Sequence, residues 1–296
     1  IHRFVAGNGP AGCASGSGLS LLQRLAKVAQ DCSQSTAIVF LADGEAESAE
    51  LRTFIELQDR ARRVAAALVQ QVHAGDRVLL LLSPGADFFA AVWGCLLANV
   101  VVVPAAVPRL DAQVDFVGKI IADSGAALVL TDRVLTDSMS ALREKFSQTA
   151  SNLVWLTLEQ ALLGSADVSA DVNATADWEE PAATAPALLQ YTSGSTGMPK
   201  GVIVTHGNLA ASIDLMLGVA AIDADSTVVS WLPLFHNMGF ISFGLLPLCV
   251  GARLVLMPTE SFMLNPARWF KAISRFRGTH SGAPNIGYES CLNFLP

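Results

Sequence analysis

Charged residues are scarce in this sequence, and positive charge is scarcer than negative charge. Only 15 % of the 296 residues are charged, and 19 Lys and Arg stand against 26 Asp and Glu, for a formal net charge of −7. Nucleic-acid binding requires a basic face, so this balance argues against a nucleic-acid partner. Because 52 % of the residues are hydrophobic, the chain must instead bury a large core.

Cysteine is also rare, and its spacing excludes two kinds of stabilised fold. The five cysteines are scattered, odd in number and without C-x-x-C spacing (Cys13, Cys32, Cys95, Cys249 and Cys291). Neither a disulfide framework nor a zinc site follows from that pattern, and a reducing compartment is its simplest setting. No secretory signal is visible at the N-terminus, so we expect a cytoplasmic protein.

Lys and Arg are absent between Lys145 and Lys200, where acidic residues recur. An acidic, Ala- and Ser-rich segment of this kind is typical of a solvated connector. We therefore expect two subdomains: a first α/β subdomain over residues 1–165, an acidic connector over 166–184, and a second α/β subdomain over 185–296.

One long apolar run, residues 88–107, has Asn99 as its only polar side chain and is nominally long enough to span a membrane. Its flanks favour a different interpretation. Ser83 and Pro84 are a good helix start after the strand-like run 78–82, and Asp87 would lie near the helix N-terminus. Asn99 can end the helix in the left-handed conformation, before a strand over 100–103. The run is therefore predicted to be a buried βαβ unit.

The rest of the chain alternates between helical and strand-like patterns. We expect helices over 19–30, 54–72, 111–124 and 135–148, and strands over 36–41, 49–53, 127–130 and 153–156. The arginines on the 54–72 helix are expected to form a solvated face. Alternation of this kind predicts an α/β fold with mainly parallel sheets flanked by helices.

The most informative stretch is residues 191–201, YTSGSTGMPKG. Apolar strand-like runs precede and follow it, at 185–189 and 202–204. A loop rich in Gly, Ser and Thr exposes backbone N–H groups and hydroxyl donors, which suits phosphate, and Lys200 adds a positive charge.

Two other interpretations of this loop are weaker. A P-loop of the form G-x-x-x-x-G-K-[ST] would need Gly where Pro199 stands and Ser or Thr where Gly201 stands, and it should lead into a helix rather than a strand. A flexible linker is not normally flanked so tightly by buried strands.

Residues 191–201 resemble the phosphate-binding signature of the adenylate-forming superfamily, which includes acyl-CoA ligases, peptide-synthetase adenylation domains and fatty acyl-AMP ligases. The resemblance implies ATP and Mg²⁺ as cofactors, with a substrate carboxylate attacking the α-phosphate. It assigns ATP phosphates to Thr192, Ser193, Gly194, Ser195, Thr196, Gly197 and Lys200. Thr205 is expected to cap the next helix, and His206 beside it to be structural rather than catalytic.

A second stretch, residues 230–240, ends a predicted strand and continues at once into a turn that contains His236. Ligands in open parallel sheets bind beyond the carboxyl ends of strands, so His236 is a candidate catalytic donor to the carboxylate or α-phosphate. The stretch resembles the W-L-P-x-[YF]-H-D-M-G-L block of fatty acyl-AMP ligases, with Asn237 in place of Asp and Phe240 in place of Leu. Residues 281–285 resemble the downstream S-G-[GA]-P-N block. Together these blocks imply an acyl and adenylate pocket formed by Trp231, Asn237, Met238, Gly239, Phe240, Gly282, Pro284 and Asn285.

The substrate can also be argued from the residues themselves. Residues 226–259 contain no Asp or Glu, so a substrate ammonium group would find no partner there, whereas an apolar acyl chain would. We therefore expect activation of a fatty acid to an acyl-adenylate plus pyrophosphate, and transfer of the acyl group to a carrier-protein phosphopantetheine thiol. A fatty acyl-CoA ligase and a non-catalytic acyl- or nucleotide-binding module remain alternatives.

Several parts that the family requires are not found in these residues. The adenine and ribose block, the Y-G-x-[TA]-E segment with its metal-side glutamate, and the small C-terminal domain with its catalytic lysine are missing. The resemblance thus implies the large N-terminal region of such an enzyme, with no metal ligand of its own. We expect these 296 residues alone to turn over very slowly or not at all.

Overall fold

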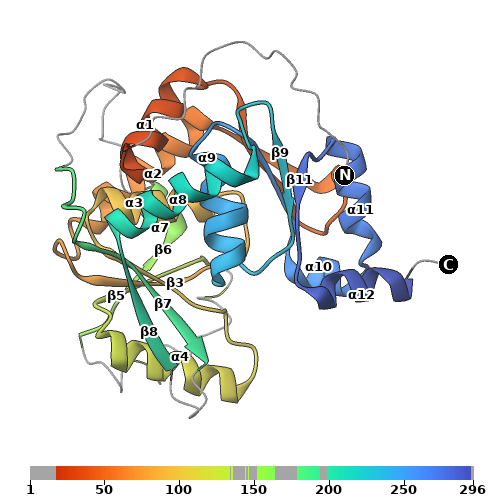
Figure 1. Cartoon of the computed structure of the whole chain (residues 1–296). Coiled ribbons are helices and arrows are strands. Elements are labelled where there is room, and N and C mark those ends of the chain that lie inside the picture. The colour runs from red at the N-terminus through yellow and green to blue at the C-terminus, as the bar shows by residue number, and fades with distance from the viewer. Residues whose placement is uncertain are drawn as a thin grey trace.

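A computed structural model of the chain describes residues 18–133, 135, 144, 146, 152–163, 179–193 and 199–294. Two sheets and three layers of helices alternate through the molecule (Figure 1). The predicted α/β class is confirmed. The predicted helix over 135–148 and most of the predicted connector lie outside the described residues.

The first sheet has five strands in the order β11-β9-β10-β1-β2. Only β2 is antiparallel to its neighbour. The strands are β1 (Thr36–Leu41), β2 (Ala49–Thr53), β9 (Thr227–Ser230), β10 (Arg253–Leu256) and β11 (His280–Ser281).

The second sheet has six strands in the order β6-β5-β3-β4-β7-β8. All pairs are parallel except the hairpin of β7 and β8 at one edge. The strands are β3 (Arg77–Leu81), β4 (Val101–Pro104), β5 (Leu128–Thr131), β6 (Val154–Thr157), β7 (Pro186–Ser193) and β8 (Pro199–Thr205).

Strand pairing crosses the division at residues 166–184 twice. β1 pairs with β10, and β4 pairs with β7, so each sheet takes strands from both predicted subdomains. The division stays a prediction about folding units, but the two sheets do not follow it.

The helices form an inner layer between the sheets and two outer layers. The inner helices are α1 (Leu21–Asp31), α2 (Phe54–Leu68), α3 (Phe88–Leu97), α8 (His206–Ala220) and α9 (Leu246–Leu248), with the π-helix η2 (Met238–Leu245). Alternate residues of each sheet face this layer: Ile38 and Phe40 of β1, and Val78 and Leu80 of β3. A short α7 (Leu158–Leu163) lies against α2, and a 3-10 turn, η1 (Ala46–Ser48), joins β1 to β2.

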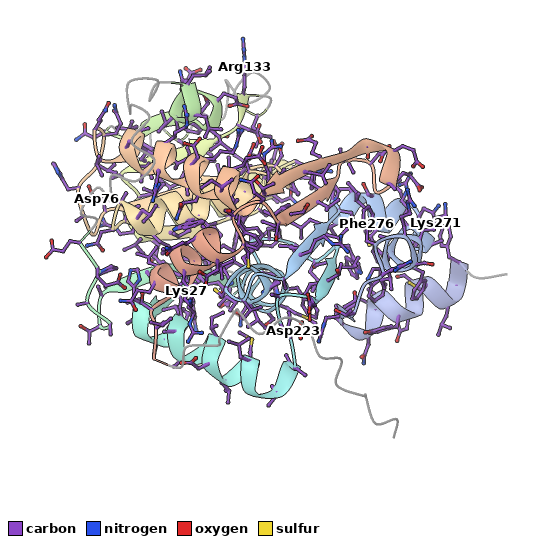
Figure 2. All side chains as sticks on the ribbon, turned by 90° about the horizontal axis from the view of Figure 1, so that it is seen from above. Lys27, Asp76, Arg133, Asp223, Lys271 and Phe276 are labelled. Atoms are coloured by element: carbon purple, nitrogen blue, oxygen red, sulfur yellow. The ribbon has the colours of Figure 1, made fainter. Side chains whose placement is uncertain are left out.

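The outer layers cover the opposite sheet faces. On the second sheet α4 (Asp111–Ser124) packs against Leu79, Leu81 and Val103. On the first sheet the outer layer is α10 (Thr259–Leu264), α11 (Ala267–Phe276) and α12 (Asn285–Phe294), which pack with Val39 and Val229. Figure 2 shows that Lys271 of α11 and Arg133, after β5, lie on well-separated sides of the molecule.

The apolar run after β3 forms the predicted βαβ unit. Every residue from Phe88 to Leu96 is buried, and Asn99 ends the helix with φ at +54°. Gly94 is required at the crossing with α2, because a Cβ there would come within 2.6 Å of Val64. No helix in the described part of the chain has the length and hydropathy to cross a membrane.

One prediction about the start of α3 was wrong: the helix begins at Phe88 rather than at Pro84. Asp87 lies at the helix N-terminus as predicted, as the N-cap residue, but its side chain makes no capping bond. Instead Asp87 accepts hydrogen bonds from Arg52 Nε at 2.8 Å and Arg60 Nη2 at 2.7 Å. Arg60 is therefore bound to a half-buried carboxylate and does not belong to a solvated face, a partnership between distant residues that helical periodicity cannot reveal.

Candidate functional site

The predicted strand, loop and strand around residues 191–201 form the β7–β8 hairpin. Thr192 pairs with Lys200, and Ser193 pairs with Pro199, so these predicted phosphate-binding residues stand on the two strand ends. The side chain of Lys200 is exposed. Gly194, Ser195, Thr196 and Gly197 lie outside the described residues.

Thr205 caps α8 as predicted, through a capping box with Asn208. His206 follows it and is only 4 % exposed. Burial lowers the pKa of its imidazole, while the charge of Glu180 opposes that change. His206 is thus buried where β8 leads into α8, a position that suits a structural role.

His236 lies on the turn that follows β9, and its side chain is exposed. The backbone N–H of Met238 donates to His236 Nδ1 at 3.3 Å. A neutral imidazole whose Nδ1 accepts must carry its proton on Nε2. The turn therefore presents Nε2 as a hydrogen-bond donor.

A cavity of about 730 Å³ brings the hairpin and this turn together. Thr192, His236 and Asn237 line it on one side, and Phe116, Val117 and Ile120 of α4 line it on the other. None of the described residues that line it is Asp, Glu, Lys or Arg. Gln190 of β7 lies between the two parts and its Nε2 approaches the carbonyl oxygen of Phe235 at 3.5 Å.

The other residues predicted for the acyl and adenylate pocket lie outside this cavity. Trp231 stacks on Phe262 in the core beneath α10–α12, and Phe240 packs among Phe88 and Phe89 of α3. Gly239 is packed against the carbonyl oxygen of Pro233, where a Cβ would come within 2.4 Å. Met238 is half-buried against the core of Trp231.

Gly282, Pro284 and Asn285 form a second group, at the start of α12. A Cβ on Gly282 would come within 2.7 Å of Phe243 Cζ, and a Cβ on Gly287 within 2.7 Å of Trp231 Cζ2. This segment therefore packs tightly on the turn and helix that follow His236. The indole N–H of Trp231 is buried there without a hydrogen-bond partner among the described residues.

Sequence reasoning missed the wall of the cavity. Ala105 and Ala106 follow the carboxyl end of β4, and Phe116, Val117 and Ile120 belong to α4. The position after a parallel strand was a usable signal for the two alanines. Nothing in the sequence showed that α4 would lie beside β7.

The residues present fit ATP phosphates better than they fit a resident metal. Hydroxyl and lysine groups at the strand ends suit anionic oxygens. The described residues contain no group of three His, Cys, Asp or Glu side chains able to hold a metal ion.

Comparison with known proteins decides the family. The profile of the AMP-binding enzyme family matches residues 25–296. The chain belongs to the AMP-binding enzyme family. It resembles the medium-chain-fatty-acid–[acyl-carrier-protein] ligase JamA of Moorena producens, with 35 % identity over 264 residues, 86 % of this chain and 42 % of that protein. It is also 34 % identical to the long-chain-fatty-acid–AMP ligase FadD26 of Mycobacterium marinum, over 81 % of this chain and 41 % of that one.

Solved structures agree with these relatives. The fatty acyl-adenylate ligase from L. pneumophila, in complex with acyl adenylate and pyrophosphate, superposes with a TM-score of 0.78 at 31 % identity, over 94 % of this chain and 46 % of that chain. The fatty acid AMP ligase from Legionella pneumophila gives 0.79 at 30 % identity. The predicted resemblance and fold are confirmed, and the chain spans less than half the length of these relatives.

Proposed function

We propose that the whole protein activates a fatty acid with ATP, releases pyrophosphate, and passes the acyl group to the phosphopantetheine thiol of a carrier protein. The observation that carries this proposal is the shared cavity, in which Thr192 at the end of β7 lies with His236 and Asn237. Phosphate-binding strand ends and a hydrogen-bond donor for a carboxylate are what adenylate formation needs in one place.

The chemistry follows from these positions. A carboxylate oxygen of the fatty acid attacks the α-phosphorus, the bond from that phosphorus to the bridging oxygen breaks, and pyrophosphate leaves. Thr192 and Lys200 hold the departing phosphates, and His236 Nε2 donates to the reacting carboxylate or α-phosphate oxygen. Mg²⁺, when bound with ATP, would supply further positive charge to the phosphates that Thr192 and Lys200 hold. The thiol of the acceptor then displaces AMP from the acyl carbon.

The lining of the cavity supports an acid without an ammonium group. A substrate ammonium would need a carboxylate partner, and none of the described lining residues supplies one. The relative JamA of Moorena producens is, by its name, a medium-chain-fatty-acid ligase. We assign the protein to the cytoplasm, and the absence of a disulfide at Cys95, Cys249 and Cys291, within the part of the chain that the structure describes, supports a reducing compartment.

The test is incubation of the whole protein with a medium-chain fatty acid and Mg-ATP, with and without CoA, followed by mass spectrometry. Acyl-AMP that persists in the presence of CoA supports carrier-protein transfer. Conversion to acyl-CoA assigns the protein to the CoA ligases instead. Neither product with any acid would contradict catalysis and favour a binding module.

A further inference from the structure

The hydroxyl of Tyr191 joins the β7–β8 hairpin to α4. It donates a hydrogen bond to Asp123 Oδ2 at 2.6 Å, a length typical of an O–H donor to a carboxylate. Burial and this bond both raise the pKa of the Tyr191 hydroxyl, so the proton that it donates is retained at neutral pH. The two residues are 68 positions apart in the sequence.

Asp123 is poorly placed for its own helix. It is the last but one residue of α4, where the negative end of the helix dipole disfavours a carboxylate. A residue that violates a local preference can serve a contact elsewhere, and the bond to Tyr191 is such a contact.

The ring of Tyr191 packs over Gly201 of the neighbouring strand β8. Tyr191 pairs with Gly201 of β8, and a Cβ on Gly201 would lie 3.0 Å from Tyr191 Cζ and 3.0 Å from Leu189 Cδ1. A larger residue at position 201 would require the ring or Leu189 to shift by a few tenths of an ångström. The ring therefore lies across β8 and reaches Asp123 from there.

The next pair along the hairpin is Thr192 and Lys200. β8 is an edge strand, paired with β7 alone, so no further strand restrains it. α4, in contrast, is anchored on the sheet by Val117, Ile120 and Ile121. The bond from Tyr191 of β7 to Asp123 thus adds a polar connection between the hairpin and α4, which also packs against β8, one residue before the phosphate-binding pair.

We propose that Asp123 is a positioning residue, which acts through Tyr191 and the open space at Gly201 to hold Thr192 and Lys200 in place for the phosphates of ATP. This inference rests on the proposed function, because the Tyr191–Asp123 hydrogen bond can position phosphate-binding residues only if the protein binds ATP.

The test compares Asp123→Ala, Tyr191→Phe and the double variant in the whole protein. Each single variant should raise KM for ATP by roughly three- to tenfold, the range expected for the loss of an ordinary, solvent-exposed hydrogen bond. KM for the fatty acid should be unchanged. Because both variants remove one bond, the double variant should match the single ones. Asp123→Ala should keep or raise the Tm, since it relieves the helix end, which a merely structural residue would not do.

The matched control is Asp111→Ala, at the N-terminal end of the same helix, where the helix dipole stabilises a carboxylate. It should lower the Tm slightly and leave KM for ATP unchanged. Gly201→Ala is a second route to the same defect and should raise KM for ATP with Asp123 intact.

Amide hydrogen exchange separates this inference from the proposed function. In ligand-free protein, residues 188–193 and 199–205 should exchange faster in Tyr191→Phe and Asp123→Ala than in wild type or Asp111→Ala. Unchanged exchange and unchanged KM in both Tyr191→Phe and Asp123→Ala would overturn the inference. If wild type forms no acyl-adenylate, the proposed function fails. In that case, unchanged exchange in both variants would also overturn the positioning role of Asp123. Faster exchange in both variants would still support that role.

Discussion

Two exposed side chains carry most of the proposed chemistry at the residue scale. Lys200 stands on β8 opposite Thr192, and His236 faces the same region from the turn after β9. Their exposure distinguishes them from the buried His206, which packs at the start of α8. A reactive or binding group must reach its ligand, so the exposure of His236 at the cavity, and of Lys200 opposite the cavity residue Thr192, supports a functional role for both residues.

Replacing Lys200 tests the phosphate assignment. Lys200→Ala in the whole protein should lower kcat/KM for acyl-adenylate formation by roughly 10²- to 10³-fold, as expected when one charged donor to a transition state is lost. Lys119→Ala, a matched loss of an exposed lysine on α4, should leave the rate unchanged. A Lys200→Ala enzyme with near-normal activity would favour a binding module.

Replacing His236 tests the carboxylate donor. His236→Ala should lower kcat for adenylation by roughly ten- to a hundredfold, because a donor aimed at developing charge acts mainly on the transition state. The control is His73→Ala, which removes an exposed imidazole that is distant in sequence from His236 and does not line the cavity. Equal effects of the two variants would contradict the role given to His236.

The sequence predicted these two residues because their neighbours follow family motifs and strand ends. It did not predict Gln190 or the Asp123–Tyr191 bond, which depend on how α4 and β7 lie together. Phe240 and Trp231 show the converse difficulty: both belong to a motif block, yet their side chains fill the two cores beside the turn. A motif identifies a segment, whereas packing decides which of its side chains face a ligand.

At the scale of elements, boundaries set by local chemistry were predicted well. Thr205 caps α8 with its hydroxyl, and Asn99 ends α3 with a positive φ. Both features depend on the residue itself and its immediate neighbours, so the sequence could predict them. The start of α3 was not predicted, since Asp87 is engaged by Arg52 of β2 and Arg60 of α2 rather than by its own helix. Bonds between elements override local signals there.

This cluster predicts a pH-dependent stability. Burial alone would raise the pKa of Asp87, but hydrogen bonds from Arg52 and Arg60 outweigh it, and its pKa lies below the usual 3.8. A carboxyl with a depressed folded pKa stabilises the fold above its unfolded pKa and loses that contribution as the pH falls through the folded value. The stabilisation should therefore be complete at neutral pH and decline below about pH 4.

Asp87→Asn is the corresponding variant. It should lower the free energy of unfolding at pH 7 by about 1–3 kcal/mol, because two arginines lose a charged acceptor. The difference from wild type should shrink as the pH falls below 4, measured by urea unfolding of the whole protein. Asp59→Asn is the matched control, since its pair with Arg63 is more exposed and should contribute less. A difference independent of pH would contradict the ionic explanation.

At the scale of the whole molecule, the two sheets bind distant parts of the chain together. β1 is hydrogen-bonded to β10, and β4 to β7, so neither sheet is complete on one side of residues 166–184. The sequence predicted the strands but not this order. Periodicity identifies a strand and its buried faces, whereas partners depend on contacts between residues far apart in sequence.

The strand order makes a prediction about divided chains. Residues 1–165 and 185–296, expressed separately, should each fail to unfold cooperatively, because each lacks strands of both sheets. Circular dichroism and thermal unfolding would show this, with the undivided chain as the control. Cooperative unfolding of residues 1–165 alone would establish the predicted division as a real folding unit.

The central claim is that the β7–β8 hairpin and the His236 turn join a fatty carboxylate to ATP. Exchange of labelled pyrophosphate into ATP by the whole protein measures that step without any acceptor thiol. The account predicts exchange that requires a fatty acid, is not supported by amino acids, and is lost in Lys200→Ala. Exchange that depends on an amino acid, or none with any fatty acid, would contradict it.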